Sequence, residues 1–523
     1  MLLSAIVLLP LCFAVLVWVF PEKWVRPLAL ALAIMEFLLS LAVFKVFDPS
    51  THQIQLVEQH NWIPQFGITY FLGLDGISLW LVILTTFLTP LIVLGSWTSI
   101  TQRVRGFHAA LFVLQTSMLG TFLALDMILF YVFWELSLIP MYFIVGIWGG
   151  KRRIYATLKF FIFTMAGSVL MLLAIIYLML ITESTLGQMS ASVLDFYQIK
   201  VPFIGNDLFN PQTLAFFAFA LAFAIKVPMF PLHTWLPDAH VEAPTPGSVI
   251  LAGVMLKMGT YGFLRFAIPL FPEAAQHWSW LFLLLAVVGI IYGALVAMVQ
   301  PDVKKLVAYS SVSHMGYVML GLFAMNSLGI SGGLYQMLNH GISTGALFLL
   351  VGMIYERTHS REIADYGGLA GVLPKFTIAF FIVTLSSIAV PLTNGFIGEF
   401  LILAGTYVAA PNYAYAAVVG VVLGAAYMLW MVKRVFFGQP GRLVREATQD
   451  GHGGLQDLNW RESLTLLPLL VLIFWMGLAP NNFLNWSRSS IDFFVANKSN
   501  YRLSVIAQPA RQTREAVAQQ GFQ

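Results

Sequence analysis

Apolar stretches long enough to cross a lipid bilayer recur along almost the whole chain, with polar or Gly/Pro-rich breaks between them. A hydrocarbon core about 30 Å thick is crossed by about 20 apolar residues of α-helix. Of the 523 residues, 59% are hydrophobic and only 10% are charged, and the mean hydropathy is +0.82. Soluble domains carry about 25% charged residues, so this chain has too few charges for a water-facing surface. The sequence therefore predicts a polytopic membrane protein.

The spacing of the stretches predicts an all-α fold with about 14 transmembrane helices. We expect them at 2–20, 27–47, 77–98, 106–124, 128–147, 156–182, 211–238, 247–270, 277–298, 303–326, 329–355, 374–408, 411–437 and 463–484. The first stretch lacks a basic region before it, so we interpret it as a retained helix and not as a cleaved signal. Helices seven and twelve are too long for a straight crossing and contain proline, so we expect both to be broken.

Lysine and arginine gather in alternate connections, after helices one, three, five, nine, eleven and thirteen. These cations are Lys23, Arg26, Arg103, Arg105, Lys151, Arg152, Arg153, Lys304, Lys305, Arg357, Arg361, Lys433, Arg434, Arg442 and Arg445. The positive-inside rule makes these ends cytoplasmic and both termini non-cytoplasmic. The polar tail after about residue 487 also carries cations, but the six internal connections outweigh it. The loop AHVEAPTPGS after helix seven holds no Lys or Arg, which makes it a candidate functional element.

The segments outside the helices argue against a soluble catalytic domain. They cover roughly 48–76, 183–210, 438–462 and the tail, and the chain has neither G-x-G-x-x-G nor a Walker-type Gly-Lys-Ser/Thr motif. The net charge is only +4, without a basic block, which excludes nucleic acid as a partner. Cys12 is the only cysteine, so the chain lacks the clusters that bind iron–sulfur centres or zinc. We expect any redox cofactor in another chain.

Ionisable residues within the apolar stretches are the candidate functional residues, because a charge at mid-bilayer costs about 2.5–3.5 kcal/mol even on the lenient insertion scale. Five stand out, and they are Glu135, Lys226, Lys257, His340 and Glu399. His233 and His314 are secondary candidates, and a lone histidine in a helix is often only a satisfied hydrogen-bonding group. The alternative for the charged residues is a static buried ion pair that fixes helix packing.

Two of the charges lie beside helix-breaking residues. Pro228 follows Lys226 by two residues, and Pro391 precedes Glu399. Carbonyls freed by proline are tolerated in a membrane only where they face protein or a water-filled cavity. The shared Val-Pro steps, five helices apart, indicate an inverted repeat of the transporter type. We therefore expect three N-terminal helices at 1–105, five-helix repeats at 106–270 and 277–437, and a loop, last helix and polar tail at 438–523.

At these residues the chain resembles the antiporter-like chain M (subunit 4) family of respiratory complex I, the NADH-quinone oxidoreductase. The resemblance extends from about residue 60 to 440 and is carried by LGLDGISLW, FYVFWELSLIPMYFIVGIWGG, KVPMFPLHTWLPDAHVEAPTPGSVILAGVMLKMGTYGFLRF, DVKKLVAYSSVSHMGYV and NGFIGEFLIL. Related antiporter-like chains usually carry lysine where this chain has Glu399. This glutamate favours chain M over chains L and N.

The resemblance implies a proton relay. It implies that Glu135 and Lys226 interact as a pair, that Lys257 is the central lysine, that His340 links the hydrated axis, and that Glu399 exchanges protons with the outer half-channel. It also implies that FMN, iron–sulfur clusters and quinone bind partner subunits, with no cofactor in this chain. Expected partners are the other membrane subunits, including chains L and N, and lipids.

The expected function is proton translocation coupled to electron transfer from NADH or ferredoxin to quinone in other subunits. The alternatives are a subunit of a multisubunit Na⁺(K⁺)/H⁺ antiporter or membrane-bound hydrogenase, and a passive structural spacer. We expect the bacterial inner membrane, with the thylakoid membrane as the alternative. The electron donor, the quinone and the proton stoichiometry stay open from the sequence.

Overall fold

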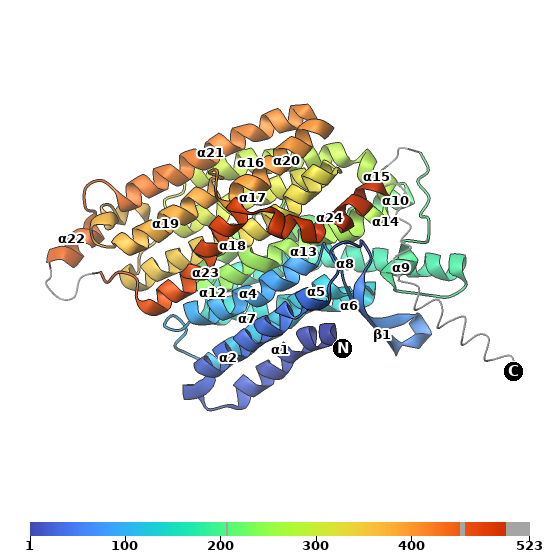
Figure 1. Ribbon diagram of the computed structural model, residues 1–523, viewed down its shortest axis with the longest axis horizontal. Helices are drawn as coiled ribbons and strands as arrows, with labels where there is room; N and C mark the ends of the chain where they lie inside the picture. Colours follow the sequence, from blue (N-terminus) through green and yellow to red (C-terminus); the bar gives the residue numbers. More distant parts are fainter. Residues whose placement is uncertain (206–207, 450–454, 498–523) are drawn as a thin grey trace.

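Long helices that run side by side take up most of the chain in the computed structural model, which describes residues 1–205, 208–449 and 455–497 (Figure 1). The N-terminal part contains α1 (Leu2–Val19), α2 (Glu22–Leu41), the short α3 (Val43–Val46) and α4 (Leu79–Gly95). Between α3 and α4 lies an antiparallel hairpin of β1 (Gln55–Ile63) and β2 (Ile68–Leu74), in which Gln55 pairs with Leu74 and Ile63 with Ile68. The helical fold is as expected, and the hairpin is an addition to the all-α prediction.

The first half of the remaining chain contains the first broken helix. Its elements are α5 (Val104–Leu123), α6 (Met127–Leu136), α7 (Leu138–Trp148), α8 (Arg153–Leu186), α9 (Val193–Phe196), α10 (Pro211–Lys226) and α11 (Trp235–Glu242). A continuous helical segment follows, in which π-helical turns alternate with α-helix. It consists of α12 (Thr245–Ile250), η2 (Leu251–Met255), α13 (Leu256–Gly262), η3 (Phe263–Ala267) and α14 (Ile268–Leu270).

The second half contains the second broken helix. Its elements are α15 (Pro272–His277), α16 (Ser279–Met298), α17 (Val303–Phe323), α18 (Ser327–Thr358), two short 3₁₀ turns, α19 (Pro374–Ser387), α20 (Asn394–Ala409) and α21 (Pro411–Phe436). The chain continues through α22 (Arg442–Gln449), α23 (Trp460–Leu478) and α24 (Asn481–Ala496). α24 was not expected, since we assigned most of its residues to the polar tail. Residues 498–523 of that tail lie outside the described residues.

Each of the fourteen expected ranges is largely helical, and the ranges 211–238 and 374–408, which we expected to be broken, are each divided into two helices. Among the described residues, eleven helices are long and apolar enough to cross a membrane. Four shorter apolar helices, α4, α10, α19 and α20, accompany them. Pro228 and Pro391 both lie in the non-helical segments between the halves of the broken helices. The count of crossings, the inverted repeat and the four-part division of the chain stay predictions.

The connections that carry the lysines and arginines meet at one end of the bundle, which we call the cationic end. Arg26 donates to the Ile100 carbonyl, and the Trp148 indole donates to the Gln102 carbonyl. In Figure 1, α22 and the connection between α1 and α2 lie at this end, whereas the chain's N-terminus, β1 and α9 lie at the other. This grouping agrees with the alternate pattern of loop charges.

The loop at 239–248, which holds no Lys or Arg, lies at the cationic end and contacts cations from other segments. Lys304 donates to the Ala243 carbonyl at 2.5 Å, and Arg361 donates to the Val241 carbonyl at 2.6 Å. The Glu242 carboxylate accepts the Arg152 backbone N–H at 2.8 Å. The first half of the chain is thus tied at this loop to α17 and to the segment after α18.

The centre of the bundle consists of α18 and the 245–270 segment. Their apolar windows are entirely buried, whereas only about a third of the window of α21 is buried. Small residues let the helices approach, as is usual within membranes. A Cβ atom added at Gly332 of α18 would lie 2.6 Å from the Ile402 nitrogen of α20. Lys257 and His340 lie on these two central segments.

A buried ion pair joins the start of α4 to η3. The Arg265 guanidinium lies 2.5 Å from the Asp75 carboxylate, and both side chains are less than 5% exposed. Asp75 also accepts the backbone N–H groups of Ile77 and Ser78. The sequence analysis did not select either charge.

We expect Asp75→Asn to destabilise the folded chain by about 3–5 kcal/mol, because it leaves the Arg265 charge buried and unpaired. The matched control is Asp492→Asn, which removes the exposed partner of Arg488 at 3.7 Å and is expected to cost at most about 1 kcal/mol. Thermal unfolding of the purified assembly measures both. Equal stability of the two variants would contradict a structural role for the Asp75 pair.

Candidate functional site: a row of buried ionisable residues

Lys226 ends α10 at the first helix break, and only 1% of it is exposed. Its ammonium donates to the Ser137 hydroxyl at 2.8 Å and to the Trp134 carbonyl at 3.4 Å. It also lies 4.0 Å from the centre of the Trp134 ring. A helix C-terminus and an indole face both stabilise a cation. The buried lysine is therefore supported by dipoles and an aromatic ring.

Glu135 lies within electrostatic reach of Lys226 but forms no direct salt bridge with it among the described residues. The described part of the chain holds no contact between their charged atoms within 4.0 Å, and Glu135 Oε1 has no hydrogen-bond partner. Trp134 and Ser137 are three residues apart and share the helix face that meets Lys226. Glu135 follows Trp134 by one residue, a rotation of about 100°, so it projects from a different face.

The indole of Trp235 stabilises the break beside Lys226. It donates to the Ile225 carbonyl at 2.8 Å, across the gap between α10 and α11. The Ala224 carbonyl, which Pro228 leaves without its usual donor, accepts the Met229 N–H at 2.9 Å. The freed carbonyls are thus satisfied inside the protein, as a membrane interior requires.

Lys257 lies at the centre of the bundle and is fully buried. Its ammonium donates to the Ala252 carbonyl in the π-helical turn η2 and lies 2.7 Å from His340 Nδ1. An ammonium is only a donor, so Nδ1 is the acceptor when the lysine is charged. The imidazole proton then lies on Nε2, for which the described residues provide no partner.

His340 is followed by His314 and Glu399 in the same row. The two imidazole centres are 5.9 Å apart, and His314 Nδ1 lies 3.2 Å from Glu399 Oε1. Gln336 donates to the same carboxylate oxygen at 3.3 Å. A cavity of 10 Å³ lies against both histidines and Ser387. That is about the space one water molecule needs.

Neighbours in the row Lys257, His340, His314 and Glu399 are therefore hydrogen-bonded or share one water-sized cavity. Lys226 is not joined to this row by hydrogen bonds among the described residues. Between them α10 packs closely on α13, and a Cβ atom added at Gly259 would lie 2.7 Å from the Phe223 carbonyl oxygen.

His233 lies apart from the row. Its ring packs 5.1 Å from Tyr292 and 5.8 Å from Phe230, and its Nδ1 has no partner among the described residues. His240, which was not among the candidate residues, interacts electrostatically with Lys257. Its ring stacks on Phe348 at 4.6 Å, both ring nitrogens lack described partners, and it lies within electrostatic reach of Lys304 and Lys257.

His240 lies in the loop 239–248, which the absence of Lys and Arg marks as a candidate functional element. The histidine itself was not among the candidate residues. Arg265 and Glu36 carry the same signal as the chosen residues, a charge inside an apolar stretch. Among the described residues, no group of three His, Cys, Asp or Glu could hold a metal ion.

Two family models match this chain between residues 1 and 424. The family model described as "NADH:quinone oxidoreductase/Mrp antiporter, TM" matches residues 124–424, and "NADH-ubiquinone oxidoreductase chain 4, amino terminus" matches residues 1–126. The NADH-quinone oxidoreductase subunit M of Rhodobacter capsulatus is 45% identical over 510 residues, covering 95% of this chain and 96% of the relative. The chain belongs to the subunit M (chain 4) family.

Members of the family and solved structures agree along nearly the whole length. The NADH-ubiquinone oxidoreductase chain 4 of Marchantia polymorpha is 41% identical and covers 94% of this chain and 97% of the relative. A chain of respiratory complex I from Thermus thermophilus, solved with bound NADH, superposes with a TM-score of 0.85 at 33% identity, covering 95% and 99% of the two chains. A chain of the Mrp complex from Dietzia sp. shares the fold, with a TM-score of 0.83 at 20% identity, covering 97% and 100%.

We expect Trp235→Phe to lower the stability of the chain by about 1–3 kcal/mol, because it leaves the Ile225 carbonyl buried without its donor. The ring packing against Phe160, with centres 5.1 Å apart, is largely retained. Trp280→Phe, at a half-exposed indole, is the matched control. The thermal midpoint of the purified assembly measures the difference. An unchanged midpoint for Trp235→Phe would contradict the role of the indole at the break.

Proposed function

We propose that this chain is the proton-translocating, antiporter-like membrane subunit of an NADH-quinone oxidoreductase. Electron transfer from NADH or ferredoxin to quinone takes place in other subunits, which hold the FMN and iron–sulfur clusters. One observation carries the proposal for this chain. Lys257, His340, His314 and Glu399 form a buried row of groups that hold or exchange protons.

The row supplies a path for a proton through the second half of the chain. Lys257 gives a proton to His340 Nδ1 as the imidazole releases its Nε2 proton toward the water-sized cavity. His314 takes the proton across that cavity and passes it to the Glu399 carboxylate at 3.2 Å. Glu399 then releases it toward the side opposite the cationic end.

Glu135 provides the switch in the first half. In the conformation described, Lys226 is held by Ser137 and Trp134, and Glu135 lies on another face of the same helix. A rotation of α6 at its end near Ser137 brings the carboxylate toward the lysine. An opposite charge within about 4–6 Å favours the charged amine, and its withdrawal favours proton release toward Lys257.

The free energy needed to export a proton is comparable to the change in interaction free energy that such a switch provides. A membrane potential of roughly 150–200 mV opposes the export of one proton by about 3.5–4.6 kcal/mol. Approach or withdrawal of one carboxylate at a buried lysine changes its interaction free energy by a comparable amount. No charge within the described part of the chain needs to move across the whole bilayer.

Proton uptake is supported by His240 and its loop. His240 lies between the cationic end, where Lys304 binds the Ala243 carbonyl, and the central Lys257. An imidazole can take up a proton on one nitrogen and release one from the other, so His240 suits the transfer of protons from the aqueous phase. His233 and His314 were both expected to assist the relay, and only His314 is assigned to its main row here.

The family relation supports the remaining assignments. The proposed partners are the other membrane subunits of the complex, including the antiporter-like chains L and N, and the surrounding lipids. The proposed location is the bacterial inner membrane, with the cationic end in the cytoplasm and both termini on the other side, as the loop charges indicate. The thylakoid membrane is the alternative location.

The second candidate function is that of a subunit of a multisubunit Na⁺(K⁺)/H⁺ antiporter. The full-length fold similarity to the Mrp chain favours keeping it. Co-purified hydrophilic iron–sulfur subunits support the oxidoreductase, and small membrane subunits alone support the antiporter.

We expect Lys226→Ala and Glu135→Ala each to reduce proton pumping coupled to quinone reduction by about tenfold or more, because either change removes the switch. Membrane vesicles that contain the fully assembled complex, energised with NADH, measure the pH gradient by fluorescence quenching. Lys375→Ala and Glu183→Ala, at exposed positions, are the matched controls. Wild-type pumping in both switch variants would refute the mechanism.

A second prediction concerns the centre of the row. His340→Leu removes the acceptor 2.7 Å from the Lys257 ammonium. Leucine can neither accept nor release a proton, so the step from Lys257 toward His314 loses its carrier, and proton transfer is expected to slow roughly 10- to 100-fold. The same vesicle assay reads it, with exposed His60→Leu as the control. Unaltered pumping by His340→Leu in an assembled complex would remove His340 from the path.

A further inference from the structure

Glu36 is a carboxyl group in the spanning helix α2 that the proposed relay does not use. Glu36 is fully buried, and neither of its carboxyl oxygens has a hydrogen-bond partner among the described residues. Buried polar groups without partners are rare in native proteins, and each one calls for an explanation. The N-terminal helices are therefore more than a spacer at this position.

The placement of Glu36 follows from its neighbour on the same face. Ser40 lies one turn further along α2, and its hydroxyl is 2.7 Å from the Thr86 hydroxyl of α4. α2 runs away from the cationic end and α4 runs toward it, so Glu36 is level with Thr89 and Pro90. Pro90 has no N–H for the Thr86 carbonyl, which adds a hydrogen-bond acceptor at this level.

Helix α5 brings further polar groups without described partners to the same region. α5 packs on α2. Both amide atoms of Gln115, Thr116 Oγ1 and His108 Nε2 are buried and lack described partners. α2 and α5 both start at the cationic end, where Arg26 of α2 and His108 of α5 interact electrostatically. Gln115 follows His108 by seven residues, which places it about one turn before the level of Glu36.

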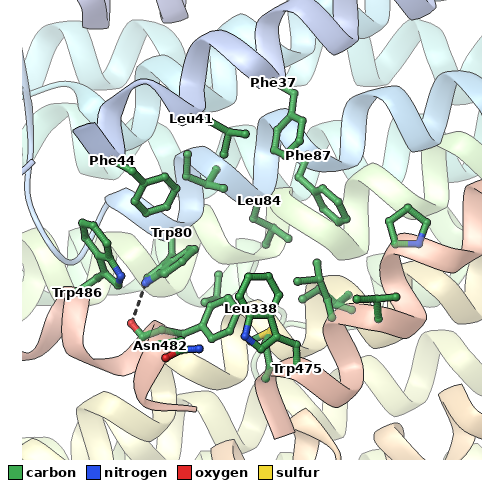
Figure 2. A pocket seen from close by; sticks show the side chains of 17 residues that line it. Phe37, Leu41, Phe44, Trp80, Leu84, Phe87, Leu338, Trp475, Asn482 and Trp486 are labelled. Carbon is green, nitrogen blue, oxygen red and sulfur yellow. Dashed lines mark hydrogen bonds between the residues drawn. The ribbon is translucent and has the colours of Figure 1, made fainter. Parts of the chain in front are cut away.

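The other face of α2 is closed to protons. Figure 2 shows Phe37 and Leu41 of α2 and Phe44 of α3 pointing into a pocket of 510 Å³, together with Trp80 and Phe87. Almost all of the side chains around it are apolar. Asn482 is the one amide side chain among the residues that line this pocket, so it offers water and ions few polar contacts. The more polar route from Glu36 is the one between α2 and α5.

The charges around Glu36 favour its protonated form. In α1 the only ionisable side chain is the exposed Cys12, and α4 has none. In α5, His108 is the buried ionisable group, and Arg105 is exposed at the helix start. Arg26 on α2 itself is ten residues away, nearly three turns of helix. With no cation at hand, burial disfavours the carboxylate and favours the neutral acid.

We propose that Glu36 is a second proton-binding site of this chain, separate from the row at Lys257. It exchanges its proton with water at the cationic end along Gln115 and His108, which lie on one face of α5, with Thr116 next to Gln115. The ligand is the proton itself, bound as a carboxylic acid. This inference does not depend on proton pumping by the central row.

Infrared spectroscopy of the assembled complex in membranes tests the protonation state and the exchange together. A protonated carboxyl has a C=O stretching band distinct from that of a carboxylate. We expect Glu36→Gln to remove one such band and Glu22→Gln, at the exposed start of α2, to remove none. In D₂O the band is expected to shift promptly in the native complex and at least about tenfold more slowly in the Gln115→Leu/Thr116→Val double variant.

Chemical labelling of the native complex provides a test that needs no variant to assemble. Apolar carbodiimides modify buried protonated carboxyl groups, and mass spectrometry of the peptides locates the adduct. Labelling of Glu36 and not of Glu22 supports the proposal. Absence of the Glu36 adduct, no band lost in Glu36→Gln, or a band that resists exchange over many hours would each overturn it.

Discussion

The hydrogen bond between the Lys257 ammonium and His340 determines how the rest of this bundle is arranged. An ammonium without water needs acceptors on every side, and here they are an imidazole from α18 and a carbonyl from a π-helical turn. Both elements must be buried along their length to keep the bond dry. The remaining helices therefore surround these two central segments, and the least buried spanning helices are α1, α2, α21 and α23.

Each helix break places a charge where a continuous helix would offer no support. At the first break, Lys226 lies at a helix C-terminus over an indole ring. At the second break, the Asn394 carbonyl at the start of α20 accepts the Asn339 amide, whose neighbour Gln336 binds Glu399. A cation is thus matched to a negative helix end, and an anion lies in a network of amide donors. The prolines create both environments by removing backbone hydrogen bonds.

Hydropathy and the cost of buried charge predicted most of the helices, both breaks and the buried ionisable residues of the central row as candidates, because these properties depend on short stretches of sequence. The hairpin at 55–74 escaped detection, since its first strand, QLVEQHNWI, is largely polar and lies in the segment 48–76 that we assigned to the connections outside the helices. The π-helical turns around Lys257 arise from packing against α18 and have no local pattern. The face on which Glu135 projects depends on the register of one helix against another, so the expected pair with Lys226 was not resolved by spacing alone.

The loop at 239–248 holds no Lys or Arg of its own and is bound by cations from other segments, which connects the two halves of the chain. Lys304 and Arg361 belong to the second half of the chain, and they donate hydrogen bonds to backbone carbonyls at the end of α11, the second part of the first broken helix. These two hydrogen bonds link the end of α11 to elements of the second half of the chain. A displacement of the end of α11 would therefore strain the hydrogen bonds to the start of α17 and to the segment that follows α18, which couples the positions of the two halves.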